Sequence, residues 1–402
     1  MLLVICDGLG DRPVPQLGGR TPLQAARTPT LDAMAAEGSC GQIDPIGPGI
    51  VAGSDTSHLA LLGYDPYRYY SGRGPIEAMG VGLRLRGGDL ALRFNFATVI
   101  PHGGELIVSD RRAGRIDSQT GPLAAALDGT VIDGVTFLVK EGTEHRGALV
   151  LRGEGLSTEI SDVDPHREGG IARCRATAPQ GERTAALLNA FTAKSHQVLS
   201  THPVNLARVE AGKGAANCLL ARGGGVLAPL PPLSERHHIT VLGIAGVALI
   251  KGLCHWMGME VAEVPGATGA LHSDYVAKVE AALKSSHDLV VINFKAPDIA
   301  GHDGDAQAKV AAIERIDAAM GHVRSRFDGI VALTADHCTP VTTKEHSGDT
   351  VPLLMWGPGV RQDGVRCFDE IAVASGALGR LPGTALMPIL LQLAGRSEKY
   401  GA

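Results

Sequence analysis

Six aspartate and histidine residues stand where short apolar runs of the sequence end or are about to begin. They are Asp7, Asp298, His302, Asp336, His337 and His346. Taken singly, each could be a turn former, a helix cap or a strand terminus. Carboxylates and imidazoles together are common ligands of divalent metals, and clustered carboxylates repel one another unless cations neutralise them. The joint pattern therefore predicts a metal centre.

A serine in "VAGSDTSHLALLGYDP" (residues 51–66) adds an oxygen ligand and a potential nucleophile. Ser54 could be the N-cap of a helix that stops at Gly63, because serine is a favoured capping residue. It could also be presented at the helix start as a ligand of the metal centre. One residue can do both. We interpret His58, one helical turn later, as structural.

The ligand types also bear on the metal. Mixed carboxylate and imidazole ligands favour Mn²⁺ or Zn²⁺, whereas an all-oxygen site would favour Mg²⁺ or Ca²⁺. Seven ligands, counting Ser54, suit two metals that share one site.

The elements that must position these ligands read as a parallel sheet with helices. Continuous apolar runs occur at residues 2–8, 238–246, 288–298, 329–337 and 351–359. Such runs are typical of parallel strands buried on both faces. Helical spacing at 272–286 and 305–327 lies between them. The pattern predicts an α/β fold, a doubly wound and mostly parallel sheet whose ligands lie at the carboxyl ends of the strands.

The middle of the chain differs and predicts an inserted domain. Residues 86–225 alternate short strand-like segments with turns, which favours a smaller α+β domain, and a Gly- and Pro-rich stretch at 221–235 reads as a linker. The first expected strand precedes this block and most others follow it. We therefore predict a discontinuous domain of residues 1–85 plus 226–402.

Composition narrows the class of protein. The net charge is −5 and no long basic run occurs, which argues against nucleic acid as a partner. The longest apolar run, "ITVLGIAGVALIKGL", is too short to span a bilayer, so we expect no membrane partner. Seven scattered cysteines without a C-x-x-C motif favour reduced thiols and a cytoplasmic protein. The sequence does not determine the oligomeric state, and a homo-oligomer is one alternative.

Five motifs in order resemble a known family. They are "DGLGD", "GSDTSHLALLGYDP", "PDIAGHDGD", "TADHCTP" and "EHSGDTVP". They look like the metal-binding motifs of the alkaline phosphatase superfamily, and more narrowly of the archaeal-type cofactor-independent phosphoglycerate mutases. "YYSGRGPIEAMGVGL", "RFNFAT" and the 202–225 region also resemble that branch. The resemblance covers nearly the whole chain.

The resemblance implies roles for these residues. Asp298, His302 and His346 would bind one metal, whereas the other would be bound by Asp7, Ser54, Asp336 and His337. Ser54 would be the nucleophile. Lys251 matches a lysine beside the phosphoserine, although it could also be a solvated loop lysine. Two divalent ions are implied, with Mn²⁺ first and Zn²⁺, Co²⁺ or Mg²⁺ as alternatives, and no 2,3-bisphosphoglycerate.

The resemblance also implies the reaction, the interconversion of 3-phosphoglycerate and 2-phosphoglycerate through phosphoserine. The substrate, a phosphorylated hydroxy acid, needs cationic partners, which we expect mainly in residues 86–225. The candidate substrate-binding residues are Arg73, Asp110, Arg111, Arg146, Asp164 and His166. Alternatives are a phosphatase, a phosphopentomutase, a homoserine-kinase-like transferase, or a silent metal-binding protein. Intact Ser54 and Lys251 argue against the last.

Overall fold

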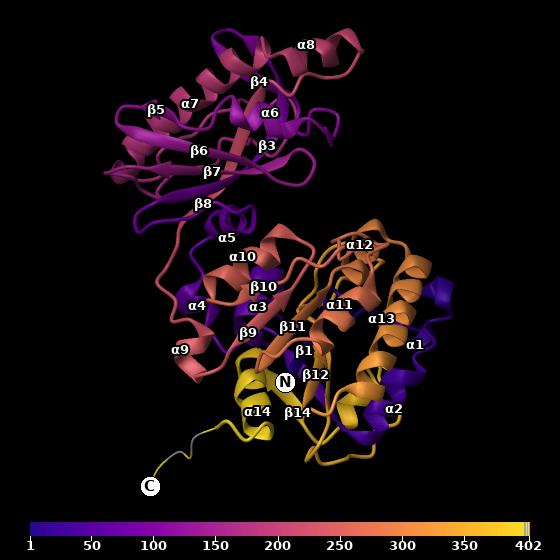
Figure 1. Ribbon diagram of the computed structural model, residues 1–402. Helices are drawn as coiled ribbons and strands as arrows, with labels where there is room; N and C mark the ends of the chain where they lie inside the picture. Colours follow the sequence, from indigo (N-terminus) through magenta and orange to yellow (C-terminus); the bar gives the residue numbers. More distant parts are fainter. Residues whose placement is uncertain (398, 400, 402) are drawn as a thin grey trace. The chain divides into compact units, whose positions relative to one another are not determined.

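The computed structural model describes residues 1–397, 399 and 401, and the chain divides into two units. The core unit comprises Met1–Tyr70 and Leu230–Ala402, and the inserted unit comprises Ser71–Pro229 (Figure 1). The core unit is thus built from both ends of the chain. In the part of the chain that is described, none of the helices has the length and apolarity needed to cross a membrane.

Within the described residues, an eight-stranded sheet with the order β10-β9-β11-β1-β12-β13-β2-β14 forms the centre of the core unit. The strands are β1 (Leu2–Cys6), β2 (Ser39–Asp44), β9 (Val241–Ile244), β10 (Glu260–Val261), β11 (Leu289–Phe294), β12 (Val331–Thr334), β13 (Val351–Trp356) and β14 (Gly379–Pro382). The wholly buried β1 pairs in parallel with β11 on one side and β12 on the other. The strands from β10 to β12 all run in parallel, which confirms the predicted mostly parallel sheet.

The predicted strand at 351–359 exists as β13, but it runs against the expected direction. β13 is antiparallel to both β12 and β2. A parallel neighbour needs a crossover connection, usually a helix. Residues 335–350, which join β12 to β13, form turns without a helix, so the chain returns antiparallel. The sequence does not predict β2, β10 or β14; β10 has only two residues and β14 is mostly exposed.

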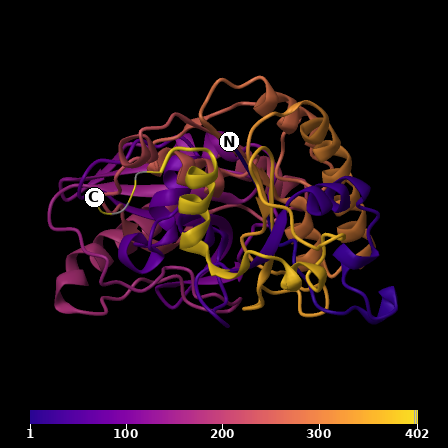
Figure 2. The ribbon, with the colours of Figure 1, turned by 90° about the horizontal axis from the view of Figure 1, so that it is seen from below.

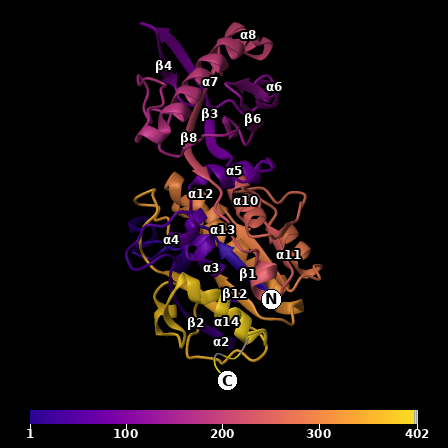
Figure 3. The same cartoon turned by 90° about the vertical axis from the view of Figure 1, so that its left-hand side faces the viewer.

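Helices cover both faces of this sheet, as a doubly wound fold requires (Figures 1 and 3). One layer consists of α1 (Pro22–Ala25), α2 (Pro29–Glu37), α11 (Tyr275–Leu283), α12 (Ala296–Asp303) and α13 (Ala306–Arg326). The other consists of α3 (Ser54–Leu61), α4 (Pro66–Tyr69), α9 (Leu233–His237), α10 (Ala248–Trp256) and α14 (Leu386–Leu393). Figure 2 shows the indigo N-terminal helices beside the orange α13, which they contact.

The two helices predicted between the strands start at capping aspartates. The Asp274 side chain accepts a hydrogen bond from the Ala277 amide at the start of α11, and Asp305 accepts one from Ala308 at the start of α13. Each carboxylate satisfies an amide that has no partner within the helix and opposes the positive end of the helix dipole. The helix starts predicted from the spacing of apolar residues differ from the observed ones by up to three residues.

In the inserted unit, the described residues form an antiparallel sheet with the order β4-β3-β7-β6-β5, and β8 also pairs with β3. Its strands are β3 (Leu90–His102), β4 (Glu105–Asp110), β5 (Thr130–Ile132), β6 (Val135–Glu141), β7 (Arg146–Arg152) and β8 (Cys218–Val226). Its helices are α5 (Arg73–Gly80), α6 (Thr120–Ala125), α7 (Glu182–Ser200) and α8 (Pro203–Glu210). The inserted unit also contains a short 3₁₀ helix at Pro179–Gly181, and the core unit contains three, at Pro15–Leu17, Ala372–Ser375 and Gly383–Ala385.

The boundaries of the inserted unit differ from the predicted ones. α5 packs on β3, β7 and β8, so residues 71–85 lie with the inserted unit rather than with the core unit. A Cβ on Gly74 would lie 2.2 Å from the Ala91 carbonyl oxygen, and one on Gly225 would lie 2.1 Å from that of Ser71. These glycines let α5 approach the sheet. The three consecutive glycines at 223–225, which we predicted to lie in a linker, belong to β8. The inserted unit ends at Pro229.

Candidate metal centre and active site

Three neighbouring strands deliver acidic side chains to one place. Asp7 follows β1, Asp336 lies two residues after β12, and Asp298 lies in the first turn of α12, which follows β11. These strands are adjacent in the order β11-β1-β12. Because parallel strands end at the same edge of a sheet, the side chains that follow them converge.

The first ligand group consists of Asp298, His302 and His346, whose ligand atoms lie within 4.8 Å of one another. The Nε2 atoms of His302 and His346 lie 3.4 and 3.5 Å from Asp298 Oδ1. Asp298 and His302 are four residues apart in α12, which places both on one face of the helix. The carboxylate is buried and His302 is exposed, so the group opens to solvent on the histidine side.

The second ligand group consists of Asp7, Asp336 and His337, which are all buried and also lie within 4.8 Å of one another. His337 Nε2 lies 3.6 Å from Asp7 Oδ1 and 3.3 Å from Asp336 Oδ2. Ser54 Oγ lies 3.1 Å from the same nitrogen, so the serine joins this group. The rings of His337 and His346 stack with centroids 3.6 Å apart, which places the two groups side by side.

His302 and His346 point their Nε2 atoms at each other. Their Nδ1 atoms lie 2.8 Å from the carbonyl oxygens of Lys344 and Ala52, respectively. Because a carbonyl oxygen only accepts hydrogen bonds, each Nδ1 carries the proton. The two Nε2 atoms lie 3.2 Å apart. Although burial opposes the shift, the Asp298 carboxylate and the Ala52 carbonyl raise the pKa of His346. Both nitrogens and an Asp298 carboxylate oxygen lie within 4.8 Å of one another, so a metal ion could take all three as ligands.

His337 has the same tautomer for a different reason. Thr339 Oγ1 donates to Asp298 Oδ1 at 2.7 Å, so the hydroxyl can only accept from His337 Nδ1, which lies 3.1 Å away. The lone pair of His337 Nε2 is therefore directed at Asp7, Asp336 and Ser54. Metal-ligating histidines typically donate their second ring N–H in this way, which fixes the ring.

The electrostatics of the second group also suit the binding of a cation. Burial, reinforced by the Asp336 charge, raises the pKa of Asp7 to about 8, although Lys295 opposes the shift. Burial lowers the pKa of His337 to about 4. Asp336 Oδ2 is buried and accepts no hydrogen bond from any described residue. A buried site with an unsatisfied carboxylate oxygen and a neutral imidazole suits a divalent metal ion.

Ser54 is the first residue of α3, and Gly53, not the serine, occupies the N-cap position. The Ser54 hydroxyl contacts His337 instead of capping the helix, so the capping interpretation is wrong. Its side chain is nevertheless at the positive end of α3, where backbone amides favour anions. His58 is buried beside the second group: its Nδ1 lies 3.7 Å from Asp336 Oδ2 and, more closely, 2.7 Å from the Ser54 carbonyl oxygen. That contact fits the structural interpretation of His58.

Lys251 lies on α10, a helix that contacts α3, but its ammonium group pairs with Glu263 at 2.7 Å. Glu263 is exposed, so the lysine is held at the surface rather than among the two ligand groups. A different lysine, which the sequence analysis did not predict, lies beside the ligand groups. Lys295 Nζ lies 2.8 Å from Asp7 Oδ1 and 2.7 Å from Asp298 Oδ2. Its place directly after β11, in a cluster of buried carboxylates that needs a cation, is the signal that could have revealed it.

Two further residues that the sequence did not single out hold ligands in place. Asn293 Nδ2 donates to Asp7 Oδ2 at 3.1 Å from within β11. Thr339, described above, holds Asp298 and His337. Both residues are buried next to ligands, where an uncharged side chain in an apolar or turn segment carries no sequence signal of its own.

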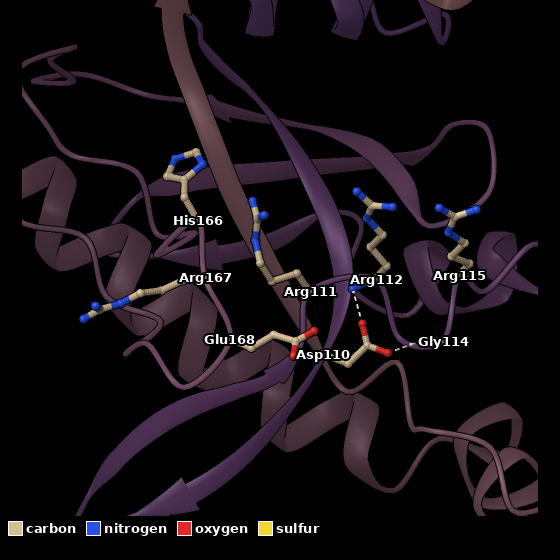
Figure 4. Close-up of a pocket in the computed structure, with 8 residues that line it drawn as sticks. All are labelled: Asp110, Arg111, Arg112, Gly114, Arg115, His166, Arg167 and Glu168. Atoms are coloured by element: carbon tan, nitrogen blue, oxygen red, sulfur yellow. Dashed lines mark hydrogen bonds between the residues drawn. The ribbon is translucent and has the colours of Figure 1, made fainter. Parts of the chain in front are cut away.

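In the inserted unit, a cavity of about 520 Å³ gathers positive charge (Figure 4). Its lining consists of Asp110, Arg111, Arg112, Gly114, Arg115, His166, Arg167 and Glu168. Figure 4 shows Arg111, Arg112 and Arg115 extending in similar directions from the segment that follows β4. The sequence motif "SDRRAGRI" contains these arginines, of which only Arg111 was predicted to bind substrate.

The acidic residues predicted to bind substrate are engaged with the protein. Asp110 accepts hydrogen bonds from the amides of Arg112 and Gly114 at 2.7 and 2.6 Å, so it shapes the turn. Buried Asp164 accepts two hydrogen bonds from the Arg111 guanidinium, at 2.9 and 2.6 Å. This fork fixes Arg111 and holds the pKa of Asp164 below its usual value, despite the opposing effect of burial.

The other predicted substrate residues lie nearby in the inserted unit. His166 lines the cavity and its Nε2 is 2.8 Å from Asp162 Oδ2. Arg146 is exposed at the start of β7 and lies outside the lining residues. Arg73 also lies outside the lining, on α5, and pairs with Glu77 at 2.8 Å.

Comparisons with known proteins place this architecture in a family. The sequence profile of the 2,3-bisphosphoglycerate-independent phosphoglycerate mutases matches residues 35–205. A mutase of this name from Methanopyrus kandleri is 47% identical over 100% of this chain and 98% of its own length. One from Thermoplasma acidophilum is 47% identical over 100% of this chain and 99% of its own length.

Solved structures agree with the sequence relatives. A protein from Pyrococcus horikoshii has a TM-score of 0.87 at 37% identity, and the match covers 100% of this chain and 98% of that one. A cofactor-independent phosphoglycerate mutase from Thermoplasma acidophilum has a TM-score of 0.74 at 42% identity, with 98% and 99% coverage. On this likeness over its full length, the chain belongs to the family of 2,3-bisphosphoglycerate-independent phosphoglycerate mutases.

Proposed function

We propose that this protein, as a phosphoglycerate mutase and hence an isomerase, interconverts 3-phosphoglycerate and 2-phosphoglycerate through a phosphoserine on Ser54. The observation that carries the proposal is the position of Ser54 Oγ. It lies at the start of α3 and contacts His337 Nε2, the atom around which Asp7 and Asp336 gather. A nucleophile, a metal-ligand set and an anion-binding helix end thus coincide.

Two divalent metals would be held by the two ligand groups, Asp298, His302 and His346 in one and Asp7, Asp336, His337 and Ser54 in the other. Bound metals would supply Lewis-acid stabilisation of phosphoryl oxygens and a lower pKa for the serine hydroxyl. Mn²⁺ suits this mixture of carboxylates and imidazoles, and Zn²⁺, Co²⁺ or Mg²⁺ are alternatives. The family name excludes a need for 2,3-bisphosphoglycerate.

The chain's own residues would carry out two displacements. Ser54 Oγ loses its proton and forms a bond to the substrate phosphorus, while the bond from phosphorus to the substrate oxygen breaks and that oxygen takes up a proton. Glycerate then re-orients, and its other hydroxyl attacks the phosphoserine, which regenerates the serine hydroxyl. Covalent catalysis of this kind divides one difficult transfer into two. Water must be excluded, since its attack would release phosphate.

The glycerate carboxylate needs a cationic partner, and the inserted unit concentrates such groups. Arg111, Arg112, Arg115 and His166 line one cavity, and Arg111 is held in place by its fork with Asp164. We assign carboxylate binding to this arginine cluster and to Arg146. A cytoplasmic location would suit the seven cysteines, which are all unpaired.

The test is a mutase assay with Mn²⁺ and 3-phosphoglycerate, coupled to enolase, on the wild type and on Ser54→Ala. We expect the substitution to abolish turnover while leaving the fold and most of the metal content unchanged, because it removes the nucleophile but none of the six carboxylate and imidazole ligands. Mass spectrometry of protein trapped with substrate should map phosphate to Ser54.

Ser57→Ala is the matched control. Ser57 is buried on the same helix, and its Oγ has no hydrogen-bond partner among the described residues, so the variant should retain wild-type turnover. Undiminished activity in Ser54→Ala, or phosphate mapped to another residue, would contradict the proposal.

A further inference from the structure

Lys295 is the one cation seen to join the two ligand groups of the described structure. Its ammonium group bridges Asp7, which belongs to one group, and Asp298, which belongs to the other. The lysine is the N-cap residue of α12, and four-fifths of its side chain is buried. The ammonium therefore supplies positive charge to carboxylates that would otherwise repel one another.

The two contacts of Lys295 are not equivalent at the level of atoms. On Asp7, the ammonium lies 2.8 Å from Oδ1, the same oxygen that lies 3.6 Å from His337 Nε2. Lys295 thus occupies the oxygen that the second ligand group offers to a metal.

On Asp298, one carboxylate oxygen contacts Lys295 and the other faces the histidines of the first ligand group. The ammonium contacts Oδ2 at 2.7 Å, whereas His302 and His346 approach Oδ1. The other neighbour of Oδ1 is the Thr339 hydroxyl, which is uncharged and orients the carboxylate. The first ligand group therefore keeps its ligand oxygen away from the Lys295 ammonium group.

We propose that Lys295 sets the order in which two divalent metals load. A metal binds first and more tightly at Asp298, His302 and His346. A metal at Asp7, Asp336 and His337 binds second and more weakly, because it must take Asp7 Oδ1 from the ammonium group and because two cations at close range repel. This inference rests on the metal sites of the proposed function and adds a role for a residue outside both ligand sets.

The test is calorimetric titration of the metal-stripped protein with Mn²⁺, supported by Mn²⁺ electron paramagnetic resonance. The wild type should show two unequal steps, and His302→Ala should remove the tighter one. In Lys295→Met, the weaker step should tighten by at least about tenfold, the size expected for one charged hydrogen bond, and by more than the tighter step.

Two other variants separate charge from shape. Lys295→Arg retains the charge and should keep the weaker step weak. Lys284→Met removes an exposed lysine of the same unit and should leave both steps unchanged. Removing Lys295 leaves buried carboxylates unpaired, so Lys295→Met is expected to unfold at a lower temperature than the wild type in chelator and to recover on adding Mn²⁺. Lys295→Gln provides a second neutral variant if Lys295→Met does not fold once stripped.

The outcomes distinguish this inference from the proposed function. Equal steps in the wild type, loss of the weaker step in His302→Ala, or a weaker step that neutral substitution of Lys295 leaves unchanged would each overturn the loading order. A wild type that binds no Mn²⁺ would overturn the metal sites of the proposed function as well.

Discussion

At the scale of single residues, His145 in the inserted unit shows how burial controls charge away from the metal centre. It precedes β7, is buried, and its Nδ1 makes no hydrogen bond with any described residue. Burial first, and then the nearby arginines, lower its pKa to about 4. Those arginines are Arg112, Arg115, Arg146 and Arg222, and the exposed Glu144 lies 3.7 Å from the ring. His145 is therefore neutral at physiological pH.

This shift predicts a pH dependence of stability. Unfolding returns the pKa to 6.5, so between pH 6.5 and 4 the unfolded chain binds a proton that the folded chain does not, and stability falls as the pH falls through this window. From pH 7 to pH 5 the loss is about 2 kcal/mol. Urea denaturation at both pH values should show that His145→Gln loses less stability than the wild type by about this amount. Equal losses would contradict the assignment of a neutral buried histidine.

Site residues could be predicted from the sequence where a charged or polar residue stands in an unusual place. Aspartates and histidines directly after apolar runs are conspicuous, so the sequence identifies all members of the two ligand groups that the structure brings together. Lys295 follows the same kind of run but reads as an ordinary surface lysine, because one of its carboxylate partners, Asp7, is distant in sequence, and nearby Asp298 reads as a metal ligand. Asp110 and Asp164 look like substrate ligands until the amides and the arginine that occupy them are seen.

At the scale of elements, the turn after β1 brings Asp7 close to α12. Gly8 has a φ of +65°, and a Cβ there would lie 2.6 Å from Asp298 Cα and 2.7 Å from Thr339 Oγ1. Its amide donates to Asp336 Oδ1 at 3.1 Å. This close approach of backbone to backbone is what allows the two ligand groups to be neighbours.

Gly8→Ala should therefore lower the free energy of unfolding by more than backbone strain alone would. The positive φ accounts for about 1 kcal/mol, and displacement of Asp298 should add further destabilisation and weaken Mn²⁺ binding at least about tenfold. Gly18→Ala is the control, because Gly18 has a φ of +68° with no atom within 4 Å of an added Cβ. Chemical denaturation and Mn²⁺ titration of both variants give the comparison. If the two variants bind Mn²⁺ equally well, the turn does not position the site.

Helices and strands could be predicted where the residue pattern of the segment itself determines them. They could not be predicted where contacts with another segment determine the direction of a strand or the role of its glycines. The apolar runs of β1, β11 and β12 identify buried strands, and the caps of α11 and α13 lie within three residues of the expected starts. The direction of β13 depends on how the preceding loop closes, and the glycines of β8 depend on α5 packing against them. Neither is encoded in the segment itself.

At the scale of the whole molecule, the proposed function divides the work between two units. In that proposal, the core unit would supply Ser54 and the metal ligands, and the inserted unit would supply arginines for the carboxylate. Binding energy from that distant carboxylate can hold glycerate while it re-orients. A weakened grip should let glycerate leave before the second transfer, and water would then release the phosphate.

Arg146→Ala and Arg111→Lys should each lower mutase activity about ten- to a hundredfold and raise phosphate release relative to transfer, with unchanged metal content. Lysine replaces Arg111 because it keeps a charge for buried Asp164, which alanine would leave unpaired. Parallel assays of enolase-coupled turnover and free phosphate give both rates. Arg173→Ala, which removes an exposed arginine paired with Glu105 in the same unit, should change neither.

The opposite result would be informative at this scale. If Arg111→Lys and Arg146→Ala both behave like Arg173→Ala, those two residues do not bind the substrate. If no basic residue of the inserted unit affects either rate, the division of labour itself is wrong.

The pairing of β1 with β11 bears on how the protein is made on the ribosome. Leu2 pairs with Val290 and Leu2 also pairs with Val331, so the apolar first strand has no partner on either side until most of the chain has been translated. At roughly 5–20 residues per second, that wait is on the order of tens of seconds. The inserted unit is continuous in sequence and can fold during the interval. The nascent first strand should therefore be the segment most dependent on chaperones, and neither metal-ligand group can be completed before synthesis is nearly finished.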